Sequence, residues 1–453
     1  MTGDARPRLG PLNLVTIWLG LVLLIPSVLV VPGLGAVGTP ANLFGLGLAG
    51  VWVLGRIQGK SNDDLGFQWA YVALGAYLVG NLMAYMAGHT RGIDPDEALA
   101  ADRWMLATIS YMGVALVAAD GLRDRRDVSE LLRRTTYFAS FVSFLGAIQF
   151  FTDFDPIRFM TLPGLQLNDG AILSIVVEEN FDRVSATAGH PIEFGVVMAA
   201  MLPLALHFVM HAPNEIVLRR SRIVLFMIGL GVPISIGRSS TLALGIAMFV
   251  LATIWNRRQL VTAAFFGVIA MFGLRAAVPS LLGTILTLFT GLEDDSSISA
   301  RTSDYDEAFD YISQDPWFGR GPNTFDPGEY LLLDNQLLKS TIEIGYFGIF
   351  TLLVMIVIGL NLGRAVLSRA FDDDTRHLGQ ALVASLWALT ITLAFADMLF
   401  YAQFTGLLFL FIGVSAALNR TKDQHAPDET AVAPTRPVMR RTLTAAVRPP
   451  DHD

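Results

Sequence analysis

Residues 243–254 read ALGIAMFVLATI, an uninterrupted run without a charged side chain. Apolar residues occupy successive positions here, whereas a strand of a transmembrane barrel alternates apolar and polar residues. Lipid offers no partners to backbone N–H and C=O groups, so a continuous apolar span must be helical. Extended to 238–255, the run approaches the roughly 20 residues that cross a hydrocarbon core about 30 Å thick. This stretch therefore predicts a transmembrane helix.

The composition of the whole chain supports the same class of protein. Its 453 residues are 53% hydrophobic and 16% charged, and the mean hydropathy is +0.51. A soluble domain has roughly 25% charged residues, so this chain lacks the polar surface to cover itself in water. A nucleic-acid binder, a disordered chain, a collagen-like repeat and, without cysteine, a disulfide scaffold are all excluded.

Twelve stretches are apolar enough to span a bilayer, which predicts an all-α polytopic membrane protein. Residues 1–420 are expected to form the transmembrane domain. Residues 421–453, rich in Pro, Thr, Arg and Ala, are expected to form a disordered cytoplasmic tail. The predicted spans are 11–32, 41–56, 67–88, 102–119, 134–152, 190–210, 222–237, 238–255, 260–282, 337–360, 379–399 and 403–419.

The distribution of basic residues predicts the orientation. Most of the 32 Lys and Arg residues fall on alternate connections together with both termini. Because cytoplasmic segments carry an excess of Lys and Arg, both termini are expected in the cytoplasm. Two outer connections, 153–189 and 283–336, are then long, and long loops in a compact protein are uncommon unless they are functional or disordered.

The second long loop contains a helical pattern. Ser303 and Asp306 have the spacing of a capping box, and the apolar residues that follow recur at helical intervals. A short amphipathic helix is expected, either as a cover on the bundle or on the membrane surface. The apolar positions are Tyr305, Ala308, Phe309 and Ile312. A turn-rich segment, 316–322, follows and precedes Asp334-Asn335.

Arginines on the outer side are the strongest candidates for a binding site. Arg238 interrupts an apolar stretch, and Arg183 lies just before a span. Arginine at membrane depth is costly and commonly faces a cavity or a partner, and its planar guanidinium suits a phosphate or diphosphate. The alternative is that such side chains extend to the interface, as is plausible for Arg103 and Arg275.

Other polar residues have simpler interpretations. Asp334 alone would be an N-cap of the following helix. The acidic runs 293–295 and 372–374 are interpreted as solvated surface. The seven histidines show no spacing typical of a metal site, so no metal is expected.

Taken in order, these residues resemble the bacterial O-antigen ligase and polymerase superfamily. Residues 301–321 resemble the family's arginine followed by P-x-x-G-x-G. Asp334-Asn335 resembles the start of its H-[N/S/Q]-x9-G-x-x-G signature. Residues 236–240 resemble its S-R-G/S element, and 183–191 (RVSATAGHP) its R-x-x-G-x-x-x-x-P region. The positions in the first two segments are Arg301, Ala308, Ile312, Pro316, Gly319 and Gly321, then Asp334, Asn335, Gly345 and Gly348.

The resemblance implies a GT-C-like membrane enzyme with a large, partly helical outer loop before the tenth span. Its members transfer a glycan from a polyprenyl-diphosphate carrier to an acceptor hydroxyl with inversion, without metal or cofactor. Transferred to this chain, Arg238 and Asp334 would be catalytic, and Arg183, Arg301 and Arg320 would bind the diphosphate. The motif residues Asn335, Gly319, Gly321, Gly345 and Gly348 would be structural. Asp334 replaces the ligase histidine, which favours a polymerase of repeat units.

The resemblance also implies the partners and the location. The expected partners are a polyprenyl-diphosphate-linked oligosaccharide, a glycan acceptor, the lipid bilayer and polysaccharide export or chain-length proteins, with no nucleic acid. The expected location is the bacterial plasma membrane, with the site on its outer face.

Three alternatives remain open. One is an O-antigen-type ligase that moves glycan to a final acceptor. Another is a transporter or lipid-linked glycan flippase, which predicts polar residues in mid-membrane; here Glu193 and Asp397 lie near span ends. The last is a peptidoglycan polymerase of the shape, elongation and division type.

Overall fold

A computed structural model describes residues 10–59, 68–152, 154–160, 162–168, 176–178, 181–277, 296–370 and 372–421. Side chains of residues 176–178, 181, 182, 274, 277 and 296–304 are not described. The acidic run 293–295 and residues 422–453 of the predicted tail lie outside these ranges.

Within the described ranges the chain is helical, with four short strands at the edge of the bundle. The thirteen α-helices are α1 (Pro11–Leu24), α2 (Pro40–Ile57), α3 (Trp69–Thr90), α4 (Pro95–Gly121), α5 (Arg125–Phe151), α6 (Pro191–Met210), α7 (Glu215–Ile234), α8 (Arg238–Ala252), α9 (Arg257–Ala277), α11 (Ser296–Gln314), α12 (Gln336–Arg369), α13 (Asp373–Thr392) and α14 (Ala402–Arg420). The 3₁₀-helices are η1 (Gly35–Gly38) and η3 (Pro156–Phe159), and the strands are β1 (Leu29–Val30), β2 (Gln166–Leu167), β3 (Val176–Glu178) and β4 (Phe181–Arg183).

Six of these helices, α2, α3, α4, α6, α12 and α14, are long and apolar enough to cross a membrane, so the chain is a polytopic membrane protein. Each of the twelve predicted spans overlaps a helix, but twelve crossings stay a prediction. The first predicted span, 11–32, is wrong at its end. Helix α1 stops at Leu24, and Leu29 pairs instead with Leu167 of β2.

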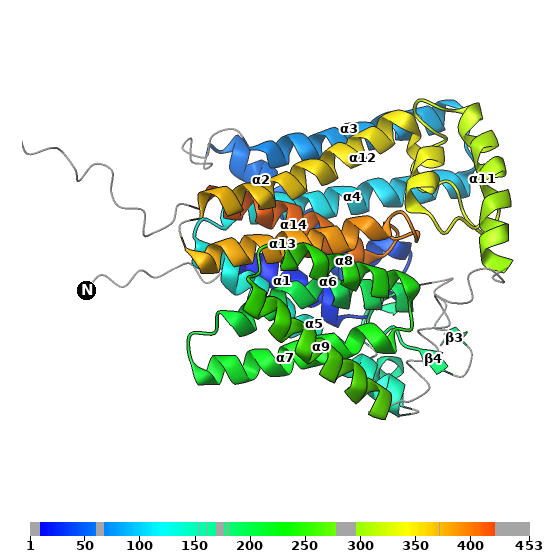
Figure 1. Cartoon of the computed structure of the whole chain (residues 1–453). Coiled ribbons are helices and arrows are strands. Elements are labelled where there is room, and N and C mark those ends of the chain that lie inside the picture. The colour runs from blue at the N-terminus through cyan, green and yellow to red at the C-terminus, as the bar shows by residue number, and fades with distance from the viewer. Residues whose placement is uncertain are drawn as a thin grey trace, which may run out of the picture.

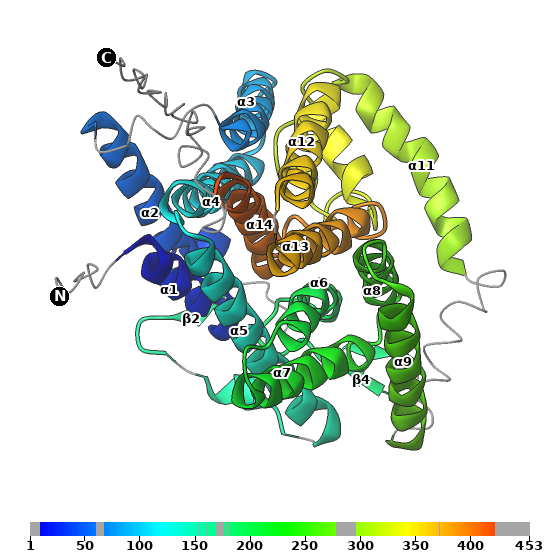
Figure 2. The same ribbon diagram turned by 60° about the vertical axis from the view of Figure 1, so that its left-hand side comes forward.

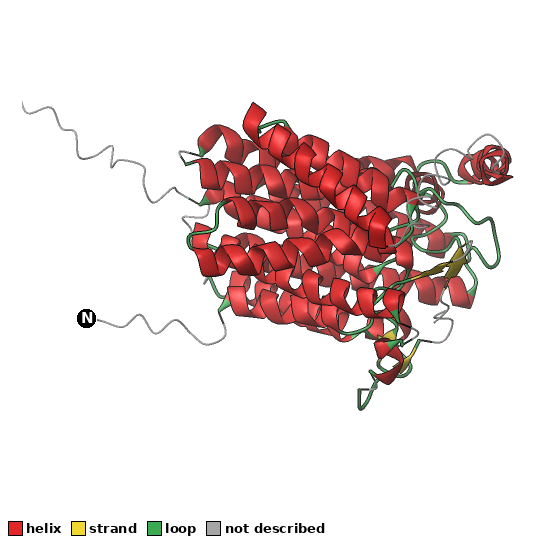
Figure 3. Ribbon diagram, turned by 60° about the horizontal axis from the view of Figure 1, so that its bottom comes forward, coloured by secondary structure: helices red, strands yellow, loops and turns green. Residues whose placement is uncertain are grey.

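The helices lie side by side in one bundle, and the strands and α11 gather at one end of it (Figures 1 and 3). We call this end the loop end. The described chain begins and finishes at the opposite, terminal end. There, a Cβ on Gly121 would lie 2.3 Å from Cβ of Pro11, and Arg420 donates a hydrogen bond to the Leu122 carbonyl.

Helices α6, α13 and α14 occupy the middle of the bundle (Figure 2). Helix α14 packs tightly on α4, because Gly413 lets the Ala115 carbonyl approach to 2.2 Å from where a Cβ would be. Helix α9 lies at the periphery and exposes Phe265, Phe266 and Phe272. Exposed aromatic side chains on a helix of this kind are suited to contact lipid.

Candidate functional site

Helix α12 is broken near its start, and the turn-rich segment fills the break. Gly345 has φ 65° and ψ −177°, which interrupts the helical ladder. Backbone groups freed on either side of it bond to residues 316–321. The bonds run from Arg320 N to Ile342 O (3.0 Å), Gly321 N to Glu343 O (2.9 Å), Tyr346 N to Pro316 O (2.8 Å) and Phe347 N to Trp317 O (3.1 Å).

This close approach explains two of the glycines in the motif. A Cβ on Gly345 would lie 2.4 Å from the Trp317 carbonyl carbon, and one on Gly319 would lie 2.4 Å from the Glu343 carbonyl. Both residues also have positive φ, which glycine adopts without steric cost. On the other side, Gly88 of α3 admits the Arg320 carbonyl. The glycine spacing therefore reflects backbone packed directly on backbone.

Three contacts fix the start of α12, and with it Asp334. Asn335 is the N-cap, since its side chain accepts from Leu338 N at 3.1 Å. The Gln336 side-chain carbonyl accepts from the backbone of the α13–α14 connection, and Lys339 forms a 2.7 Å ion pair with Asp397. The alternative interpretation of Asp334 as the N-cap is therefore wrong. Asp334 precedes the cap and is exposed at the loop end.

The α11 prediction is confirmed in part. The helix begins at Ser296, seven residues before Ser303, so Ser303 does not cap it. Ala308 and Ile312 are buried in a cluster with Phe325, Leu333 and Ile342, whereas Tyr305 and Phe309 are exposed. The exposed pair is placed to contact the membrane surface.

A cavity of about 850 Å³ opens at the loop end. It lies between the start of α4 and the connections that precede α6 and α14. Its wall includes Arg103, Arg183, His190, Asn323 and Tyr401. Charged, aromatic and amide groups thus converge in a space large enough for several sugar rings, which agrees with the usual size of a ligand site.

His190 occupies a defined position in this wall. It is the N-cap of α6, and its Nδ1 accepts from Ile192 N at 3.2 Å. Because Nδ1 accepts a hydrogen bond, the neutral ring carries its proton on Nε2. The ring packs on Tyr401, with centroids 5.7 Å apart and planes inclined by 30°.

Arg183, His190 and Asp334 are close enough to influence one another. Burial, and to a smaller extent the charge of Arg183, lower the pKa of His190 from 6.5 to about 4, while the charge of Asp334 acts in the opposite direction. His190 is therefore neutral at physiological pH. Burial likewise raises the pKa of Tyr401, with contributions from Glu193, Asp397 and Asp334.

Glu193 holds the His190 turn in place. Its side chain is fully buried and accepts hydrogen bonds from the backbone N–H groups of Gly189 (2.7 Å), Gln403 (2.7 Å) and Phe404 (3.1 Å). These bonds connect the start of α6 to the start of α14. These three hydrogen bonds explain why a polar residue, Glu193, lies near the end of the predicted span 190–210.

The turn before α8 brings Arg183 and Arg238 into the same region. Arg183 Nε donates to the Ser235 carbonyl at 3.4 Å. Arg238 is the first residue of α8, three residues further along, and is half-buried. Neither Arg238 nor Asp334 lines the cavity wall. They lie beside the region that Arg183 and His190 reach.

Backbone strain concentrates around this region. Of the described residues other than glycine, three have positive φ: Ala186, Ile236 and Asn323. Ala186 and Asn323 line the cavity, and Ile236 is two residues before Arg238. A β-branched residue in this conformation is a true outlier, and such strain clusters at functional sites. Ala186 also stands where the R-x-x-G-x-x-x-x-P pattern has glycine.

Arg320 has a different environment from the one expected. Its Nη2 donates to Glu97 Oε1 (2.9 Å) and to the Tyr330 hydroxyl (2.6 Å), and its guanidinium lies 4.0 Å from the centre of the Tyr330 ring. Arg91 also pairs with Glu97. Arg320 therefore joins the turn-rich segment to α4 and is not part of the cavity wall. Arg301 lies in α11, and its side chain is not described.

Sequence reasoning missed His190 and Tyr401. His190 belongs to the RVSATAGHP segment, and its position immediately before Pro191 was the available signal, because proline favours the first helical position. The sequence spacing of the histidines indicated no metal site, but the fold brings His207, His211 and His377 together at the terminal end.

Comparison with known families identifies the region that carries most of these motifs. Residues 223–353, from α7 through the broken start of α12, match the model described as O-antigen ligase. This range includes Arg238, Asp334 and the glycine motif, but not Arg183 or His190. No curated protein matches the chain. The chain is thus a multi-pass membrane protein that carries a domain of the O-antigen ligase family.

Proposed function

We propose that the protein is a glycosyltransferase that polymerises lipid-linked oligosaccharide repeat units into a surface polysaccharide or exopolysaccharide. The supporting observation is the convergence at one cavity of an arginine, a neutral imidazole and a nearby carboxylate. The donor is a polyprenyl-diphosphate glycan, and the acceptor is a hydroxyl of a second lipid-linked glycan. The transfer proceeds with inversion and without metal or cofactor.

The chemistry assigns each group a task. The acceptor oxygen forms a bond to the anomeric carbon as the bond from that carbon to the diphosphate oxygen breaks, and the electron pair leaves with the diphosphate. Arg183 and Arg238 stabilise the developing negative charge, with Arg301 in support. His190 Nε2–H donates to a phosphate oxygen. Asp334 orients the acceptor hydroxyl and takes its proton as the new bond forms.

Arg320 takes a positioning role in this proposal. Its ion pair with Glu97 and its aromatic neighbours stabilise the segment that packs into the break of α12. That packing in turn fixes the start of α12, where Asp334 lies. Loss of Arg320 is therefore expected to act through the stability of the loop end.

The proposed setting is the plasma membrane, with twelve crossings, both termini in the cytoplasm and the loop end outside. Basic side chains at the terminal end, such as Arg56, Arg125 and Arg420, favour this orientation. The polyprenyl chain of the donor would extend into the bilayer beside the bundle. Proteins that export the polysaccharide or set its length are proposed partners.

A ligase is the second candidate, because the family description names that activity. The two are distinguished by gel analysis of surface glycans from a strain in which the chain is deleted. A polymerase predicts single repeat units in place of long chains, whereas a ligase predicts long chains that stay unattached. Unchanged glycans, with a defect only in movement of the lipid-linked unit, would support a flippase instead.

A further inference from the structure

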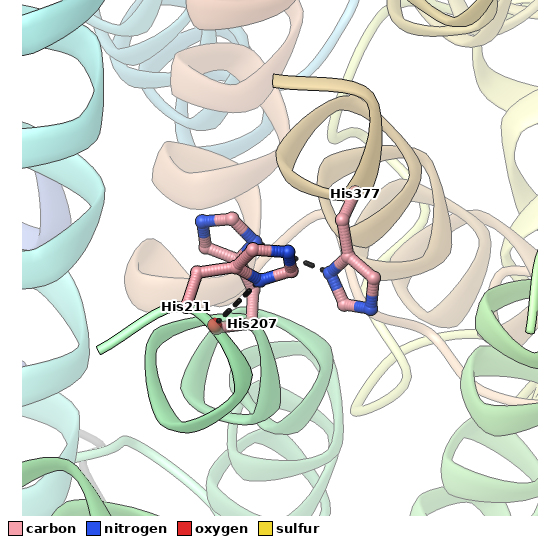
Figure 4. A group of neighbouring side chains, drawn as sticks. All are labelled: His207, His211 and His377. Atoms are coloured by element: carbon pink, nitrogen blue, oxygen red, sulfur yellow. Dashed lines mark hydrogen bonds between the residues drawn. The ribbon is translucent and has the colours of Figure 1, made fainter. Parts of the chain in front are cut away.

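Three histidine side chains meet at the terminal end of the bundle. His207 lies in the last turn of α6, His211 is the C-cap of that helix, and His377 comes from the start of α13. Figure 4 shows the three rings facing one another. Nδ1 of His207 and Nδ1 of His377 are 3.2 Å apart, and one ligand nitrogen from each ring lies within 4.8 Å of the others. The chain has only seven histidines, so this convergence is notable.

The separations fit a shared ion. Ligand nitrogens about 2.0–2.1 Å from a tetrahedral zinc ion lie roughly 3.3 Å from one another, close to the 3.2 Å between the His207 and His377 nitrogens. The ring centroids are 4.8, 4.9 and 5.3 Å apart. Small side-chain rotations therefore suffice to bring the third nitrogen to bonding distance.

In His207 and His211, the ring nitrogen that would not bind the ion has a hydrogen-bond acceptor nearby. A metal-bound histidine commonly donates its other N–H to a carboxylate or a backbone carbonyl. His207 Nε2 lies 3.4 Å from Asp374 Oδ1, and His211 Nδ1 lies 3.3 Å from the His207 carbonyl. These contacts leave Nδ1 of His207 and Nε2 of His211 available to an ion.

We propose that His207, His211 and His377 bind one divalent transition-metal ion of the zinc class. Three imidazole ligands suit Zn²⁺, Co²⁺ and Ni²⁺ better than Mg²⁺ or Ca²⁺, which prefer oxygen. His207 and His377 are buried, and half-buried His211 gives the ion its access from solvent. The fourth position is filled by water, because Asp374 stays beside His207 Nε2 and pairs with Arg125.

The ion joins α6 to α13 at the end of the bundle opposite the cavity. Helix α6 begins with the His190 turn and has 20 residues, so about 30 Å separates the two sites. The ion is therefore structural: it fixes the far end of the helix that presents His190. This inference is independent of the proposed function.

Trp255 disfavours the tautomer of His377 that binds a metal ion, so a substitution at Trp255 tests the proposal. Its Nε1–H donates to His377 Nε2 at 3.1 Å. An indole only donates, so without metal His377 carries its proton on Nδ1 and donates it to His207 Nδ1. When metal occupies Nδ1, the proton of His377 must sit on Nε2, facing the indole N–H. Replacing Trp255 with Phe removes that conflict and should tighten binding.

The test uses full-length protein purified in detergent without a polyhistidine tag, stripped with chelator and titrated with Co²⁺. The expected result is one equivalent bound, with the visible absorption of tetrahedral cobalt, and displacement by Zn²⁺. His207→Gln and His377→Gln should each weaken binding at least 100-fold, and Asp374→Asn about 10- to 100-fold. Trp255→Phe should strengthen it. His89→Gln, at an exposed position on α3, is the matched control and should bind like the wild type.

A wild type that binds no stoichiometric Co²⁺, or a His377→Gln variant that binds equally well, would overturn the proposal. Folding is checked separately by monodispersity and by melting in metal-free buffer. Zn²⁺ should raise the melting temperature of the wild type but not that of His377→Gln. If a histidine variant does not fold, Trp255→Phe and Asp374→Asn carry the test, because the proposal requires their affinities to move in opposite directions.

Discussion

Gly345→Ala is expected to detach the turn-rich segment from the broken start of α12. The new Cβ would lie 2.4 Å from the Trp317 carbonyl carbon and 2.5 Å from Phe318 N. The backbone conformation at Gly345 is one that essentially only glycine adopts, which costs about 1–3 kcal/mol for another residue. Separating the two backbones also breaks the bonds from Tyr346 N and Phe347 N, at about 1 kcal/mol each. The total destabilisation is about 3–5 kcal/mol.

The assay is thermal melting of the purified variant, combined with limited proteolysis of the segment 316–335. Gly75→Ala is the control, because a Cβ there meets nothing within 4 Å and α3 is also a membrane-length helix. The control should melt at or slightly above the wild-type temperature, since alanine is the better helix former. A Gly345→Ala variant with wild-type melting and no new cleavage would refute the backbone-packing explanation of the motif.

Three further predictions follow from the site. The pKa of His190 is about 4 in the folded protein and 6.5 in the unfolded chain. The free energy of unfolding should therefore fall as the pH drops from 6.5 toward 4, as measured by melting across that range. His190→Asn retains a cap and a hydrogen-bond donor, so it should shift the melting temperature little and keep more activity than His190→Ser, which retains only the cap. Arg320→Ala should cost about 2–3 kcal/mol of stability through loss of the Glu97 pair and the aromatic stack, and equal melting of variant and wild type would contradict this. Ala186→Gly should raise stability by about 1 kcal/mol by relieving its positive φ, and a lower melting temperature would count against strain at that position.

The helical membrane fold could be predicted because apolar length is a local property of the sequence. The run 243–254 and its counterparts indicate helices without knowledge of their neighbours, and hydropathy located each of them. The early end of α1 was missed, because Leu29 leaves the helical register to pair with Leu167, more than a hundred residues away. Such pairing leaves no trace in hydropathy.

The candidate site was predicted less completely, for the same reason. The glycine spacing was visible, but its cause, one backbone packed on another, is a contact between separate segments. Arg320 could not be distinguished from Arg183 in the sequence, since both are arginines of the long outer loops. Only the fold shows that Arg320 faces Glu97, whereas Arg183 faces a cavity. The three clustered histidines were missed because His377 is far along the chain from the pair on α6.

Glycosyl transfer at the loop-end cavity can be measured as elongation of a synthetic polyprenyl-diphosphate oligosaccharide by the purified protein in detergent, with the products analysed by mass spectrometry. Products should grow by whole repeat units with the wild type and with Arg275→Ala, an exposed control arginine on α9. The reaction should be at least about 100-fold slower, with unchanged melting, for Arg183→Ala, Arg238→Ala and Asp334→Asn. Elongation at the wild-type rate by these three variants would show that transfer does not take place at this cavity.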